Sequence, residues 1–209
     1  PGSPARRREP WRTRAAPPGE PIGYHTHKDG GIYPLYGADL SRRVVFVPIA
    51  VDDDDRYALA LLNHVFGSGP SSRLFQEVRE DRGLTYSISS GVSHHVDTGA
   101  VTLHCATAPG KVDELLVVID AILDDVISRG ISREELARAK GSLRGAYLMS
   151  YEDVGSRMTR LGMTEIMRGG LTPIDVHLAR LEAVTNDEVH RVAQRVFGSQ
   201  RVLSTVGPG

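Results

Sequence analysis

The stretch that decides the fold is GSGPSSRLFQEVREDRGLTYS, residues 67–87. It opens with a glycine-rich loop, and Ser71 or Ser72 is placed to cap a helix that runs to about Arg82. Leu74, Phe75 and Val78 form the apolar stripe of that helix. Because Gly83 can end a helix and an apolar alternation follows it, the stretch predicts a loop, a helix and a strand joined by a tight turn.

Upstream of this stretch, the sequence predicts a buried strand and a second helix. Residues 44–51 read VVFVPIAV, a largely β-branched run, and residues 52–55 are all aspartate. The helix that follows has Ala58, Leu61, Leu62 and Val65 at helical spacing, and Gly67 is placed as its C-terminal glycine cap. We interpret the four aspartates as stabilising the positive end of this helix and aiding solubility, in preference to binding calcium.

Downstream, the pattern predicts a β-hairpin and then a long helix. The first strand shows one face to the core with Leu84, Tyr86, Ile88 and Val92, and the second does so with Val101, Leu103 and Cys105. Residues 97–99 supply the turn. After Pro109, an amphipathic pattern predicts a helix that ends near Arg129.

Three further helix starts carry capping residues, and a strand follows them. Ser132 with Glu135 and Thr185 with Glu188 form capping boxes, and Pro173 is placed at the first position of a helix that begins after Thr172. Residues 201–206 read RVLSTV and predict a final strand. This order predicts an α+β fold in which helices cover a largely antiparallel sheet.

Composition limits the function classes. Of the 209 residues, Lys and Arg number 25 and Asp and Glu number 26, so no overall field attracts nucleic acid or an anionic membrane. No apolar run approaches the roughly 18 residues of a membrane span. Cys105 is the single cysteine and alternates with core residues, which predicts a small buried hydrophobe and a cytoplasmic setting.

Residues 1–42 differ from the rest of the chain. Seven of the twelve prolines lie there, together with five arginines between residues 6 and 14 and Trp11. This composition predicts a linker or tail in front of a folded domain of residues 43–209. The arginines beside Trp11 leave open a nucleic-acid-binding arm as a minor alternative.

The residues alone predict no self-contained catalytic site. None of the eight histidines begins an H-E-x-x-H or H-x-x-E-H motif, and the pair His25 and His27 lacks a third ligand. Arg79 and Tyr86 flank Gly83, so a turn there could fold both side chains toward one place. Their N–H and O–H donors suit a peptide carbonyl or an oxyanion. The competing interpretation makes Tyr86 a core residue and Arg79 the partner of a nearby acid.

Residues 71–87 closely resemble the C-terminal half of zinc peptidases of the pitrilysin/insulinase family, in the branch of the mitochondrial processing peptidase. The resemblance includes residues 57–59, 62–64, 152–158 and 181–185, and it extends over roughly residues 43–208. It implies an α+β half that closes with a second half around an unfolded peptide. The zinc site of such enzymes is an H-x-x-E-H motif with a further glutamate, and it belongs to the other half.

The resemblance also implies roles for particular residues. Arg79 and Tyr86 match an arginine and a tyrosine that reach across to hold substrate, and Gly69, Ser71 and Ser72 are weaker candidates because they lie in the short glycine loop. The expected partners are a peptide and a zinc-carrying N-terminal half or separate catalytic subunit, so zinc would be bound by the partner and this chain alone would be inactive. The alternative that stays open is a non-catalytic scaffold subunit of the same fold in a larger complex.

Overall fold

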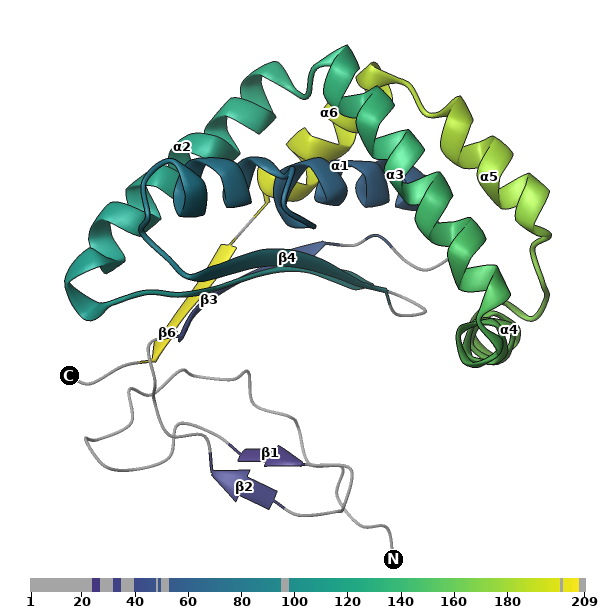
Figure 1. Ribbon diagram of the computed structural model, residues 1–209, viewed down its shortest axis with the longest axis horizontal. Helices are drawn as coiled ribbons and strands as arrows, with labels where there is room; N and C mark the ends of the chain where they lie inside the picture. Colours follow the sequence, from purple (N-terminus) through teal and green to yellow (C-terminus); the bar gives the residue numbers. More distant parts are fainter. Residues whose placement is uncertain are drawn as a thin grey trace, which may run out of the picture.

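A four-stranded sheet forms one layer of the protein, with strand order β4-β5-β3-β6 and every neighbouring pair antiparallel. The computed structural model describes residues 24–26, 32–34, 40–47, 49, 53–94, 98–199 and 201–206. The four strands are β3 (Leu40–Val47), β4 (Ser87–His94), β5 (Gly99–Ala106) and β6 (Arg201–Val206). Figure 1 shows that the helices gather on one face of this sheet. The predicted α+β class with an antiparallel sheet is confirmed.

The predicted hairpin is present as β4 and β5, which pair from Ser87 with Ala106 to His94 with Gly99. Val101, Leu103 and Cys105 are buried, while the residues that alternate with them are half-buried, as a sheet with one covered face requires. The prediction that Tyr86 faces the core was wrong. Tyr86 precedes β4 and its side chain is 85% exposed. Residue 97 of the predicted turn lies outside the described residues.

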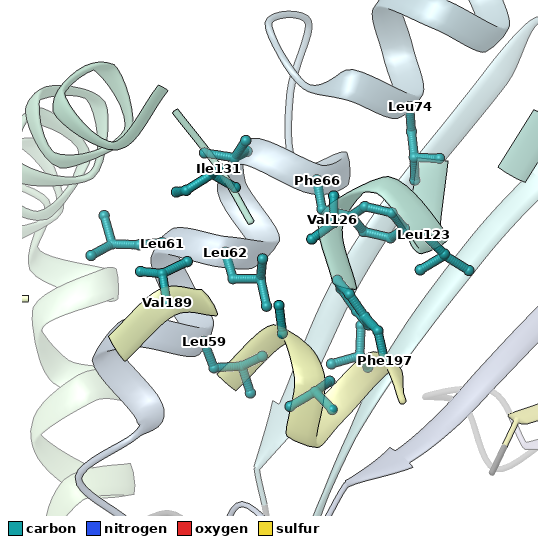
Figure 2. Packing of buried hydrophobic residues seen from close by; sticks show 14 of the residues in the cluster. Leu59, Leu61, Leu62, Phe66, Leu74, Leu123, Val126, Ile131, Val189 and Phe197 are labelled. Carbon is teal, nitrogen blue, oxygen red and sulfur yellow. The ribbon is translucent and has the colours of Figure 1, made fainter. Parts of the chain in front are cut away.

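Helices α1 (Arg56–Gly67), α2 (Val112–Arg129) and α6 (Asn186–Phe197) supply most of the core. Leu59, Leu62 and Phe66 of α1 are buried, and the Phe66 ring lies 4.7 Å from that of Phe197 on α6. Figure 2 shows Val126 of α2 beside Phe66. The apolar spacing predicted for the first helix and for the long helix is therefore confirmed.

The capping boxes predicted at Ser132 and Thr185 are both formed, and they begin α3 (Arg133–Glu152) and α6. Helix α5 (Ile174–Ala183) begins one residue later than expected, because Pro173 occupies the N-cap. Helix α4 (Val154–Arg168) was not predicted. Its N-cap is Asp153, whose carboxylate accepts a hydrogen bond from the backbone N–H of Ser156 at 2.6 Å.

The role predicted for Gly67 was wrong. Gly67 is the last residue of α1 and is buried, and the C-cap position belongs to Ser68. A Cβ atom on Gly67 would lie 2.8 Å from Leu74 Cδ1 and would also collide with Ser90. The glycine is needed because two other elements pack directly against the helix backbone.

Asp55, the last of the four aspartates before α1, also acts differently from the prediction. Asp55 is 8% exposed, makes no side-chain cap, and pairs with Arg191 and Arg195 of α6 at 2.7 Å each. Burial raises the pKa of the Asp55 carboxyl, but hydrogen bonds from the two arginines outweigh it and leave the pKa below its usual value. Asp55 therefore joins the beginning of α1 to the last helix.

The amino-terminal region contains more strand than the sequence indicated. Strands β1 (Tyr24–Thr26) and β2 (Ile32–Pro34) form an antiparallel ribbon inside the predicted linker. Strand β3 begins at Leu40 and ends at Val47, earlier at both ends than residues 44–51. The division into residues 1–42 and 43–209 stays a prediction. In the described part of the chain, no helix combines the length and the hydropathy of a membrane span.

Candidate functional site

The segment that carries Arg79 is a single wide helical turn, η1 (Phe75–Glu80), of the π type. The sequence predicted an ordinary helix here. The difference lies in the hydrogen bonds: the N–H of Asp81 bonds to the carbonyl of Gln76, five residues earlier, at 2.9 Å. Gly83 then turns the chain with a φ of +56°, a conformation that suits glycine. Single π turns are frequent at functional sites.

Arg79 and Tyr86 are brought together by this turn. The guanidinium carbon of Arg79 lies 5.3 Å from the centre of the Tyr86 ring and 4.5 Å from the centre of the Phe75 ring. Its Nε is also 3.6 Å from a Glu80 carboxylate oxygen, an ion pair at the surface. The arginine side chain is 35% exposed and the tyrosine side chain projects into solvent. The two donors thus form one accessible group, held by a cation–π contact.

The backbone on both sides of Tyr86 is anchored. Thr85 is buried, and its hydroxyl donates to the carbonyls of Ser87 and Ala106. The hydroxyl of Thr107 donates to the carbonyl of Leu84 at 2.6 Å. An exposed side chain on a backbone that is fixed in this way is pre-organised to bind a ligand.

The glycine loop places its three weaker candidates differently. Gly69, with a φ of +111°, and Ser71 are exposed. Ser72 is 2% exposed; its hydroxyl donates to the carbonyl of Gly69 at 2.7 Å and accepts from the N–H of Phe75 at 3.4 Å. Ser72 therefore shapes the loop from inside and bonds to the first residue of η1, whose N-cap position is occupied by Leu74. A role of Gly69 and Ser71 in binding stays a prediction.

A cavity of about 210 Å³ lies beside this loop, between the end of α1 and α3. Its walls include His64, Ser68, Gly69, Ser71 and Glu135. Burial lowers the pKa of the His64 imidazole, so the neutral form is favoured. No interaction joins this cavity to Arg79 or Tyr86 among the contacts of the described residues, so the two features are separate.

Sequence reasoning missed Arg73, which anchors the whole segment. Its guanidinium donates to Glu135 at 2.7 and 2.8 Å and to Asp125 at 2.7 Å. Hydrogen bonds from Arg73 lower the pKa of the Glu135 carboxyl to about 2, against the opposing effect of burial. Because these acids are 52 and 62 residues away, no local spacing could have revealed the contacts.

No group of three or more His, Cys, Asp or Glu side chains able to hold a metal ion lies within the described ranges. Cys105 is buried and has no disulfide. The His25 and His27 side chains lie outside the described part of the chain. What the described residues bring together is a pair of hydrogen-bond donors, Arg79 and Tyr86, beside the first residue of β4.

Curated relatives of this chain include proteins named uncharacterized zinc proteases. An uncharacterized zinc protease of Streptomyces coelicolor is 40% identical over 160 residues, which is 77% of this chain and 35% of that protein. An uncharacterized zinc protease of Bacillus subtilis is 33% identical over 163 residues, 78% of this chain and 40% of that protein. The chain thus spans only about a third of the length of these relatives.

Solved structures show the same fold. The peptidase M16 inactive domain from Pseudomonas fluorescens matches with a TM-score of 0.73 at 23% identity, over 83% of this chain and 42% of that chain. The inactive peptidase domain of a Bordetella parapertussis zinc protease matches with a TM-score of 0.71 at 23% identity, over 84% of this chain and 97% of that one. The family model described as the peptidase M16 inactive domain matches residues 34–143. With this match over more than half of its length, the chain belongs to the peptidase M16 inactive-domain family.

Proposed function

We propose that this chain is the substrate-binding half of a zinc metalloendopeptidase, closed in use by a zinc-carrying half. The observation that carries the proposal is the Arg79–Tyr86 pair, exposed on an anchored backbone at the start of β4. A tyrosine with a purely structural role would bury its ring, and Tyr86 does the opposite. The curated relatives are named zinc proteases, which agrees with this activity.

The pair can act on a peptide through its hydrogen bonds. The Tyr86 hydroxyl donates to the oxygen of the scissile carbonyl as negative charge develops there, and the Arg79 guanidinium holds a neighbouring carbonyl with its fixed N–H donors. Strand β4 is at one end of the strand order, so one side of it has no strand partner within the described residues. An extended substrate can add to such an edge through its backbone while Tyr86 reaches its carbonyl.

Zinc has no place in the described residues of this chain, since they offer no group of ligands. The metal therefore belongs to the other half in this proposal. The part of the curated relatives that this chain does not match, about two thirds of their length, is long enough to include that half.

The test uses this chain combined with the zinc-carrying half. We expect Tyr86→Phe to lower kcat by roughly 10²–10³-fold with little change in KM, the range seen when one oxyanion donor is lost. Cleavage of a fluorogenic peptide measures this effect. Tyr147→Phe is the matched control, because Tyr147 is half-buried on α3 and packs against His177, away from the pair.

Each outcome separates the proposal from its alternative. The chain alone should bind no stoichiometric zinc and cleave no peptide, which metal analysis and the same assay measure. One zinc per isolated chain would contradict the assignment of the metal to the other half. If Tyr86→Phe and Tyr147→Phe both keep the full rate, Tyr86 has no catalytic role and the scaffold alternative gains support.

A further inference from the structure

Exposed apolar side chains are concentrated at one end of the helical layer. Among the described residues, eight large apolar side chains are more than half exposed, and six of them lie between residues 149 and 171. These six, the α4 surface, are Met149, Val154, Met158, Met163, Ile166 and Leu171. Exposed apolar side chains gathered in one segment in this way mark an interaction site in a protein that functions in water.

Helix α4 is the centre of this surface and is poorly covered by the domain itself. None of its residues whose exposure is described is fully buried, and the apolar residues Val154 and Ile166 are each 81% exposed. Figure 1 shows α4 end-on at the outer end of α3, away from the centre of the sheet. An amphipathic helix is stabilised in most proteins by packing of its apolar face, and here the domain leaves much of that face uncovered.

Two arginines that pair with no acidic side chain of the described residues adjoin the α4 surface. Arg157 and Arg160 line a cavity of about 190 Å³ between α3, α4 and the loop before α5, together with Tyr151, Thr164 and Leu171. The Arg160 guanidinium lies over the Tyr151 ring at 3.6 Å, and its Nε is buried with no hydrogen-bond partner in the described structure. None of the ion pairs formed by the described residues includes either arginine. A buried, unpartnered N–H donor such as the Nε of Arg160 favours a ligand that carries a carboxylate.

We propose that the α4 surface is where the zinc-carrying half docks, through an apolar face with a carboxylate that enters the Arg157–Arg160 cavity. The inference rests on the proposed function for the identity of the partner. The curated relatives supply the argument for this occupant, because they contain about two thirds of a protein beyond the matched segment.

The experiment pairs this chain with the part of the Streptomyces coelicolor relative outside the matched 160 residues. Sedimentation velocity measures association of the two proteins. We expect Met158→Glu and Ile166→Glu each to weaken association by about tenfold or more, because a carboxylate is then buried against apolar atoms. Val117→Glu is the matched control: Val117 is 68% exposed on α2 and Met158 is 69% exposed on α4, and the control should bind as the parent does.

The cavity has its own variant. Arg160→Gln removes the charge that would meet the partner's carboxylate, so we expect this variant to associate more weakly than the parent. As salt is raised from 50 to about 300 mM, it should also lose less affinity than the parent does. Thermal unfolding of each variant shows whether the domain is intact. Affinity and salt dependence equal to those of the parent would remove the carboxylate from the proposal.

Three results would overturn the docking surface. The first is no association with the parent chain, or equal association of Met158→Glu and Val117→Glu. The second is a homodimer that Met158→Glu abolishes, which would make a second copy the occupant. The third is binding to anionic vesicles that depends on Met158. The two proteins can also associate through α4 while Tyr86→Phe leaves the peptidase activity of their complex unchanged. That result would overturn the proposed function and leave the docking surface standing.

Discussion

Gly67 shows how a single missing side chain sets the distance between elements. It lies where α1, β4 and the Leu74 side chain converge, and the absence of a Cβ lets Ser90 approach the helix backbone. Ser90 in turn donates a buried hydrogen bond of 2.7 Å to Asn63 of α1. The helix and the edge strand are thereby joined at close range, which positions the residues that lead into β4.

Gly67→Ala is expected to destabilise the domain by about 1–3 kcal/mol, because the added methyl group has no room. Urea unfolding measures the change. Gly141→Ala on α3 is the control, since nothing lies within 4 Å of a Cβ there and alanine favours an exposed helix by about 0.5–1 kcal/mol. Equal effects of the two substitutions would show that Gly67 has no packing role.

At the scale of elements, the turn from η1 to β4 determines the candidate site. Gly83 has a positive φ, and its N–H donates to the carbonyl of Arg79 at 3.1 Å. The N–H of Leu84 donates to the carbonyl of Val78 at 3.0 Å. These bonds reverse the chain within a few residues and bring Tyr86 back over Arg79. Lys111, in the short 3-10 turn Pro109–Lys111 that follows β5, donates a hydrogen bond of 3.1 Å to the Gly83 carbonyl.

We expect Gly83→Ala to cost about 1–2 kcal/mol of folding free energy, because an L residue is strained at this φ. Asparagine tolerates the left-handed region better, so Gly83→Asn should recover part of the loss. No atom lies within 4 Å of a Cβ at Gly83, so the difference reports backbone strain alone. Chemical denaturation of both variants measures it, and equal stability of Gly83→Ala and the parent would argue against strain.

Elements with local signals were predictable, and those decided by distant contacts were not. The capping boxes at Ser132 and Thr185 appear in the sequence because each depends on residues three apart. The adjacency of Arg79 and Tyr86 followed from the Gly83 turn, but the exposure of Tyr86 depends on where β4 begins. The anchoring role of Arg73 and the close approach at Gly67 depend on partners from other elements, which no spacing rule contains.

At the scale of the whole molecule, charged groups hold the helices to the site segment. Arg73 joins the start of the helical turn to Asp125 on α2, to Glu135 on α3 and to the Gly130 carbonyl between them. Asp55 joins the start of α1 to α6 in the same way. The Arg73 cluster therefore joins the segment before β4 to α2 and α3, and the Asp55 cluster joins α1 to α6.

The Arg73 cluster makes stability depend on pH in a defined direction. The pKa of Glu135 is about 2 when folded, against 4.5 ordinarily, so the unfolded chain binds more protons between these values. Its stabilisation is complete above pH 4.5 and is lost as pH falls toward 2. We expect Glu135→Gln to flatten the acid branch of a urea-unfolding profile between pH 5 and about 2.5. Glu134→Gln, at a residue exposed on the same turn, should keep the parent's profile.

The sheet is completed by a strand far along the chain from its neighbour. Strand β6 pairs with β3, with Leu40 opposite Val206, while β4 and β5 are joined by a hairpin. A ribosome releases β3 long before β6, so the nascent chain must carry one unpaired edge of β3 through the synthesis of every helix. Such an edge is open to wrong pairing, and this order of synthesis makes the domain dependent on shielding by its own helices or by a chaperone until the last strand emerges.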